Sequence, residues 1–110
     1  MRLLVCGGRD YSDRQRVIAE LLRLNPEVVI TGGARGADSI AAEVALDSGT
    51  PTIIMPAPWN RHGRGAGAVR NAWMLKYASP DRVLAFPGGN GTADMVRRAR
   101  AAGIAVTEVA

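Results

Sequence analysis

In residues 82–94, RVLAFPGGNGTAD, an apolar run passes through a glycine-rich turn into the start of a helical pattern. The same order occurs twice earlier in the chain, in the segments CGGRD (residues 6–10) and TGGARGAD (residues 31–38). Glycine allows a tight turn and lets a ligand approach the backbone N–H groups, and a following helix directs partial positive charge to the same place. The three turns therefore suggest a binding site for an anion.

Strand-like and helix-like segments alternate around these turns. Apolar runs predict strands at residues 3–5, 28–30, 52–55, 82–86 and 104–109. Strands that are apolar throughout favour a parallel sheet that helices cover on both faces. We therefore expect an α/β fold, a Rossmann-like three-layer sandwich of about five parallel strands. Right-handed crossovers would then bring every glycine turn to the carboxyl edge of the sheet, where ligands bind in such folds.

Local signals predict where the helices begin and end. Ser12 is expected to cap the first helix, and Asn25-Pro26 to end it. A third helix is expected over residues 68–78 and a fourth from the last glycine turn to about Ala102. Between them, residues 56–67 carry two prolines and several glycines and predict the longest loop of the chain, a feature that is often functional.

Length and composition limit the class of protein. The 110 residues suffice for one core, so a single domain over residues 1–110 is expected. Apolar residues make up 47% and charged residues 22%, which is ordinary globular usage. No apolar run approaches the roughly 20 residues of a membrane span, and no leader-like segment precedes the first strand, so a cytoplasmic protein is expected. The net charge of +4, carried almost wholly by arginine, favours phosphate-bearing partners.

The sequence lacks the residues that several common enzyme classes require. No glycine turn carries the lysine of a Walker A loop, and the first turn does not match the dinucleotide pattern G-x-G-x-x-G, so neither ATPase nor ordinary dehydrogenase activity is expected. His62 is the only histidine, which disfavours a multi-histidine metal site or a Ser-His-Asp triad. Cys6 is the only cysteine, and its apolar neighbours predict a buried thiol rather than a nucleophile.

The segment PGGNGT (residues 87–92) resembles the PGGxGT motif of the SLOG superfamily. This Rossmann-like group includes the lonely-guy-type phosphoribohydrolases and the DNA-processing DprA proteins. The resemblance extends over nearly the whole chain, because residues 7–9 stand where these proteins have a glycine-serine turn and GGARG (residues 32–36) matches their GGxxG turn. Within the superfamily, the chain is similar to small stand-alone SLOG-domain proteins of bacteria and phages.

The resemblance implies a pocket for a nucleotide or nucleotide-derived small molecule, with phosphate at the PGGxGT turn. No cofactor or metal is expected. In a phage-defence setting, cyclic or ADP-ribose-type signalling nucleotides would be attractive ligands. Trp59, in the long loop, is also expected to stack on a base. The expected ligand-binding residues are Gly7, Gly8, Arg9, Gly32, Gly33, Arg35, Gly36, Asp38, Trp59, Arg70, Asn71, Pro87, Gly88, Gly89, Asn90, Gly91 and Thr92.

The sequence departs from the enzymes of the superfamily at one position. In the lonely-guy-type enzymes the motif continues as PGGxGTxxE, but here Met95 stands in place of the catalytic glutamate. Asp94 is adjacent, yet one step along a helix turns a side chain by about 100°. Asp38 can contact a ribose hydroxyl, act as a displaced catalytic acid, or cap its helix. With Arg70, these aspartates are the only catalytic candidates, so binding is favoured over nucleotide N-glycosidase activity.

Two interaction surfaces are open alternatives. Single-stranded nucleic acid is a third candidate ligand, because Arg97, Arg98 and Arg100 form a basic helix and Arg61 and Arg64 a second basic patch. Aromatic residues, however, make up only 5% of the chain, which leaves few stacking platforms. The resemblance also implies a homodimer or higher homo-oligomer, and the helix around Trp73, Met74 and Tyr77 is the candidate surface.

Overall fold

Strands and helices alternate from end to end in the computed structural model, which describes the backbone of residues 1–110 and all side chains except those of Asn60, Arg61 and Arg64. The strands are β1 (Arg2–Cys6), β2 (Val28–Thr31), β3 (Thr52–Ile54), β4 (Arg82–Ala85) and β5 (Ala105–Glu108). The helices are α1 (Arg14–Leu24), α2 (Ala37–Asp47), α3 (Trp59–His62), α4 (Ala66–Trp73) and α5 (Asn90–Ala101), with the 3-10 turn η1 (Gly63–Gly65) and the π-helical turn η2 (Met74–Ala78).

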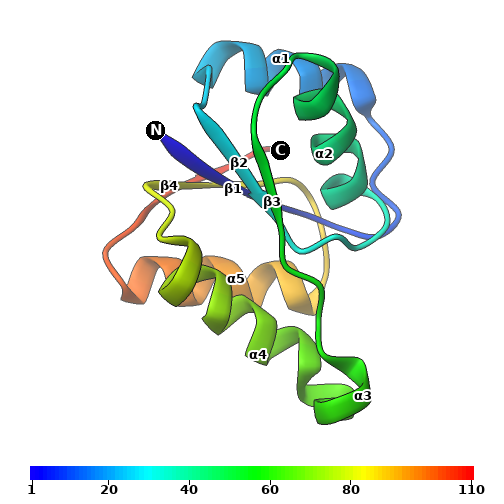
Figure 1. The fold of residues 1–110 in the computed structure, drawn as a ribbon, viewed down its shortest axis with the longest axis vertical. Coiled ribbons are helices and arrows are strands. Elements are labelled where there is room, and N and C mark those ends of the chain that lie inside the picture. The colour runs from blue at the N-terminus through cyan, green and yellow to red at the C-terminus, as the bar shows by residue number, and fades with distance from the viewer.

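The five strands form one parallel sheet in the order β3-β2-β1-β4-β5. Helices α1 and α2 cover one face, and α4 and α5 cover the other (Figure 1). This arrangement confirms the predicted Rossmann-like three-layer sandwich. No helix in the described part of the chain is long and apolar enough to cross a bilayer.

Alternating side chains of the strands build a separate core on each face of the sheet. Leu3 and Val5 of β1 belong to the cluster under α1 and α2, whereas Leu4 and Cys6 belong to the cluster under α4 and α5. This alternation follows from the two-residue repeat of a strand. Because both faces are covered, the buried part of β1, residues 3–6, is apolar throughout.

The first helix is capped one residue later than the sequence predicts. Asp13, not Ser12, holds the cap position, and its carboxylate accepts a hydrogen bond from the N–H of Arg16 at 3.1 Å. Ser12 is excluded from this role because the helix begins at Arg14. The predicted end is confirmed, with Asn25 in the left-handed conformation at φ 47°.

The segment at residues 56–67 is more regular than the expected loop. It contains α3 and η1, and α4 already begins at Ala66. Pro58 immediately precedes the first helical turn, where its fixed φ does no harm, and Gly63 ends that turn at a positive φ of 53°. Proline and glycine therefore mark the boundaries of short helical turns here.

The sheet has its topological switch point between β1 and β4. The chain runs outward from β1 through β2 to β3 and then crosses back to place β4 on the other side of β1. The turns that follow β1 and β4 consequently leave neighbouring strands, whose register pairs Cys6 with Ala85. Ligands of open parallel sheets bind in the crevice at such a point.

Candidate functional site

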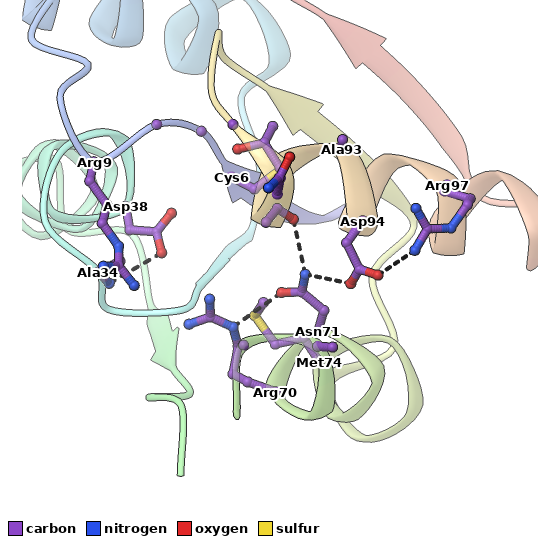
Figure 2. A pocket seen from close by; sticks show the side chains of 18 of the residues that line it. Cys6, Arg9, Ala34, Asp38, Arg70, Asn71, Met74, Ala93, Asp94 and Arg97 are labelled. Carbon is purple, nitrogen blue, oxygen red and sulfur yellow. Dashed lines mark hydrogen bonds and ion pairs between the residues drawn. The ribbon is translucent and has the colours of Figure 1, made fainter. Parts of the chain in front are cut away.

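A cleft of about 770 Å³ lies at this edge of the sheet. Its walls come from the turn after β1, the start of α2, the helix α4 and the start of α5 (Figure 2). The volume falls within the range of roughly 300–1,000 Å³ that small-molecule sites occupy. Of the residues that the sequence suggests, the cleft is lined by Gly7, Gly8, Arg9, Asp38, Trp59, Arg70, Asn71, Gly89, Asn90, Gly91, Thr92 and Asp94.

The glycines of the third turn have two different roles. A Cβ on Gly88 would collide with the Thr92 hydroxyl and lie 2.7 Å from the backbone nitrogen of Gly8, so the close approach of the first and third turns requires glycine here. A Cβ on Gly89 or Gly91 would meet no atom within 4 Å. These two glycines therefore leave open space at the start of α5 that the fold itself does not use.

The N-terminus of α5 faces this open space. Gly89 occupies the cap position and provides no side-chain acceptor for the first N–H groups of the helix. Uncapped N–H groups and the helix dipole together attract an anion. Asn90, Gly91 and Thr92 all line the cleft, so an anion bound there would be reached by the first turn of α5.

Backbone hydrogen bonds of Gly8 join the first glycine turn to the third turn and to the end of the second. The Gly8 N–H donates to the carbonyl of Pro87 at 2.9 Å, and the Gly8 carbonyl accepts from the N–H of Ala37 at 3.2 Å. Gly36 has a φ of 85° and no room for a Cβ beside the Gly8 carbonyl. The edge of the sheet is thus held as one unit.

Arg70 and Asn71 connect the helix α4 to two of the turns. The Arg70 Nη1 donates to the carbonyl of Gly32 at 2.8 Å, and its Nε donates to Asn71 Oδ1 at 3.1 Å. The amide of Asn71 donates to the carbonyl of Gly91 at 3.1 Å and to Asp94 Oδ2 at 3.0 Å. Asn71 is only 3% exposed and uses both of its N–H donors, so it holds the start of α5 in place.

Asp94 lines the cleft but is committed to partners of the protein. Its carboxylate accepts from Asn71 and forms ion pairs with Arg97 and Arg98. Burial alone would raise the pKa of Asp94, but these hydrogen bonds and charges outweigh it and lower the pKa. A carboxylate with a lowered pKa is a poor general acid near neutral pH.

Met95 stands where the lonely-guy-type enzymes have their catalytic glutamate, and it lies outside the cleft. Its side chain is fully buried in the core beneath α4 and α5, with Met74 and Ala99 in the same cluster. Since this position faces the sheet, the side chain that α5 does present to the cleft here is that of Asp94.

Asp38 stands on the opposite wall of the cleft, at the start of α2 (Figure 2). It is 5% exposed, and its Oδ2 accepts from the Ala34 N–H at 3.2 Å. Burial raises the pKa of Asp38, although the Ala34 N–H and the charges of Arg70 and Arg9 oppose the rise. Asp38 and Asp94 therefore differ sharply in electrostatic environment within one cleft.

Cys6 forms part of the inner surface of the cleft at the end of β1. Burial, with a smaller effect from the charge of Asp38, raises the pKa of its thiol to about 12. Cys6 is 8% exposed, which confirms the prediction of a buried thiol. Because the thiolate is the nucleophilic form, the raised pKa disfavours a role as a nucleophile.

The aromatic side chains near the cleft differ in exposure. Trp59 is 51% exposed, and the Arg9 guanidinium lies 5.7 Å from the centroid of its ring. Trp73 contacts His62 edge to face, with ring centroids 6.0 Å apart. Of these, Trp59 lines the cleft and offers the exposed ring that stacking requires.

Some of the residues that the sequence suggests do not line the main cleft. Gly32, Gly33 and Arg35 border an adjoining depression that also reaches Arg9, Trp59 and Arg70. Arg35 is directed toward Asp10, with which it forms a largely exposed ion pair at 3.3 Å. The others, which serve the packing of the turns, are Gly36, Pro87 and Gly88.

The structure adds lining residues that the sequence analysis does not predict. They are Cys6, Ala34, Gly67, Ala68, Met74, Ala93 and Arg97. Helical spacing was the available signal, because Gly67 stands three and four residues before Arg70 and Asn71, and Arg97 stands three residues after Asp94. Met74 is 2% exposed and faces the interior, so on the candidate oligomer surface of this helix, which stays a prediction, the accessible residues are Trp73 and Tyr77.

The basic helix is largely neutralised by neighbouring acids. Arg97 and Arg98 pair with Asp94, and Arg100 pairs with Glu108 at 2.9 Å. This pairing reduces the positive charge available to a nucleic-acid backbone. The second predicted basic patch, at Arg61 and Arg64, lies outside the described side chains.

Two comparisons with known proteins bear on this arrangement. The model of the YAcAr family, described as the YspA, cpYpsA-related SLOG family, matches residues 1–62, which include the first two glycine turns and Trp59. The Gene 61 protein of Mycobacterium phage D29 is 41% identical over 118 residues, covering 96% of this chain and 93% of that protein. The chain therefore belongs to the YspA, cpYpsA-related SLOG family.

Proposed function

We propose that the chain binds a nucleotide or nucleotide-derived small molecule in this cleft, with a phosphate group at the N-terminus of α5. SLOG membership suggests nucleotide-related binding or processing. The observation that carries the finer proposal is the unused space at Gly89 and Gly91, in front of a helix start without a side-chain cap. Glycines that packing does not need are expected where a ligand approaches the backbone.

The surrounding side chains support an extended, polar ligand. Arg9 and Arg70 bring positive charge to the cleft, and Trp59 adds an exposed aromatic ring at its border. Phosphate, hydroxyl and base together would use all of these groups, whereas inorganic phosphate alone would use few of them. A nucleotide therefore accounts for the lining better than a simple anion does.

The environments of the carboxylates in the cleft favour ligand binding without turnover. The position that holds the catalytic glutamate in the lonely-guy-type enzymes is a buried methionine here, and Asp94 is held ionised by three partners. Asp38 is the remaining carboxylate of the cleft with a raised pKa. We propose that the protein senses, carries or sequesters its ligand.

Calorimetry and thermal shift with a nucleotide panel test this proposal. The panel contains AMP, GMP, ADP-ribose and cyclic di-GMP, with inorganic phosphate as a reference. At least one nucleotide is expected to bind more tightly than phosphate and to stabilise the fold. Absence of binding by every nucleotide in both assays contradicts the proposal. Release of free base from AMP, abolished by Asp38→Asn, would instead identify a glycosidase.

A further inference from the structure

The two walls of the cleft have opposite electrostatic character. The start of α5 presents N–H groups without a side-chain cap, whereas Asp38 presents a carboxylate from the start of α2 (Figure 2). An anionic group of a ligand is attracted to the first wall, whereas the Asp38 carboxylate repels an anion and accepts a hydrogen bond. A ligand that fills the cleft therefore needs an anion at one end and a hydrogen-bond donor at the other.

The carboxylate of Asp38 has capacity to accept from such a donor. A carboxylate can accept about four hydrogen bonds. Asp38 Oδ2 accepts from the Ala34 N–H at 3.2 Å, and the Gly32 N–H also acts on the carboxylate as a hydrogen-bond donor, which leaves acceptor positions for a ligand. Asp38 itself is nevertheless only 5% exposed. Because Asp38 lines the cleft, a bound molecule can fill its remaining acceptor positions.

The charges around Asp38 restrict the kind of donor. Arg70 and Arg9 lie close enough to act electrostatically on the carboxylate. A cationic donor, such as an alkylamine, would be repelled by these two guanidinium groups. A neutral donor is not repelled by them. The hydroxyl groups of a ribose are neutral donors, and they accompany a phosphate in every ribonucleotide. An exocyclic amino group of a base is the competing neutral donor.

We infer that the carboxylate of Asp38 accepts hydrogen bonds from the ribose hydroxyl groups of the ligand. The ligand is then a ribonucleotide rather than a deoxyribonucleotide. This inference rests on the proposed function and assigns the sugar to the wall opposite α5. Asp38 is then a specificity-determining residue: it accepts from the ribose while α5 holds the phosphate. Loss of a hydrogen bond to a charged group is expected to weaken binding by about 10- to 100-fold.

The test compares each ribonucleotide of the panel, AMP, GMP, ADP-ribose and cyclic di-GMP, with its 2′-deoxy analogue by calorimetry. The protein is expected to bind the ribose form about 10- to 100-fold more tightly. Asp38→Asn keeps an acceptor for the Ala34 N–H but turns an amide toward the ligand, so this difference is expected to shrink to about 3-fold or less. Asp10→Asn, at an exposed carboxylate outside the cleft, is expected to keep the full difference.

Equal binding of ribose and deoxyribose forms by the unaltered protein overturns the inference and leaves the proposed function standing. So does an Asp38→Asn variant that folds normally and retains the full discrimination. Failure of all ribonucleotides and all deoxyribonucleotides to bind refutes the proposed function and the inference with it. IMP lacks the exocyclic amino group of AMP. If the protein binds AMP more tightly than IMP but binds AMP and its 2′-deoxy form equally, Asp38 accepts from the base, and the inference is wrong.

Discussion

Asp38 and Asp94 border the same cleft, but their surroundings shift their pKa values in opposite directions. Burial dominates at Asp38 and raises its pKa, whereas the hydrogen bonds from Asn71 and Arg98, with the charges of Arg98 and Arg97, prevail over burial at Asp94 and lower its pKa. By linkage, the ionised form of Asp94 stabilises the fold and the ionised form of Asp38 destabilises it. Buried groups that oppose stability are typical of binding sites.

The two carboxylates should therefore respond oppositely to substitution. Asp94→Asn is expected to lower the free energy of unfolding at pH 7 by about 1–2 kcal/mol, because charge-assisted hydrogen bonds are lost. Asp38→Asn is expected to raise it. The effect of Asp94→Asn should begin to fall near pH 4, where the carboxylate of the unfolded chain becomes protonated, and should disappear as the pH falls through the lowered pKa of Asp94 in the folded protein. That of Asp38→Asn should shrink earlier on acidification, because its folded-state pKa is raised.

Urea unfolding of the three proteins between pH 3 and pH 8 measures both effects. A loss of stability in Asp38→Asn at pH 7 would show that the carboxylate is structural, and it would remove the physical reason for assigning it to a ligand.

At the scale of elements, the turn between β4 and α5 contains glycines of two kinds: some are required by packing, and others leave space for a ligand. Gly88 packs against the first turn with no space for a Cβ, whereas Gly91 stands in the first turn of α5 beside open space. The sequence PGGNGT predicts the turn and its anion site but does not distinguish the two roles. The distinction depends on how closely the first turn approaches, which only the folded sheet determines.

Gly91→Ala and Gly88→Ala form a matched pair of variants. Alanine at Gly91 is expected to leave the fold intact or to stabilise α5 by up to about 1 kcal/mol, while its methyl group weakens binding of the phosphate. Alanine at Gly88 is expected to lower the free energy of unfolding by about 1–3 kcal/mol through overpacking. Thermal unfolding and calorimetry on both variants check this. Unchanged affinity in Gly91→Ala would place the ligand away from the start of α5.

Most element boundaries follow from the sequence because each apolar run and each helical period is a local signal. The strands and the ends of α1 and α5 were predicted in this way, within a residue or two. The helical turns of α3 and η1 were missed because prolines and glycines, which bound them, also signal loops. The role of Asn71 was not predictable either, because its partners Gly91 and Asp94 are 20 and 23 residues away in the chain.

At the scale of the whole molecule, the cleft exists because the sheet reverses its strand order between β1 and β4. That reversal brings the turn at Gly7 and Gly8 against the turn at Pro87 and Gly88. The prediction that the glycine turns share one edge is confirmed. The second turn, however, contributes mainly Asp38 and Ala34 to the cleft, while Gly32 and Gly33 border the adjoining depression.

Self-association remains a prediction, and the structure narrows the surface that would carry it. Tyr77 is 65% exposed beside the half-buried Trp73, whereas Met74 faces the interior. If a dimer forms through this helix, Tyr77→Asp is expected to shift the protein to a monomer in analytical ultracentrifugation. Leu46→Asp, at an exposed apolar residue of α2 on the opposite face of the sheet, is the control and should not. A monomeric unaltered protein would contradict the prediction.

Amide NMR tests the central claim most directly, because it reports where a nucleotide binds. The protein is titrated with the tightest-binding nucleotide of the panel, and shifts of the backbone N–H signals are followed. The account predicts the largest shifts at residues 89–92, with further shifts at residues 7–9 and at Asp38. Shifts confined to the groove between α1 and α2, around Leu21 and Val44, would contradict it.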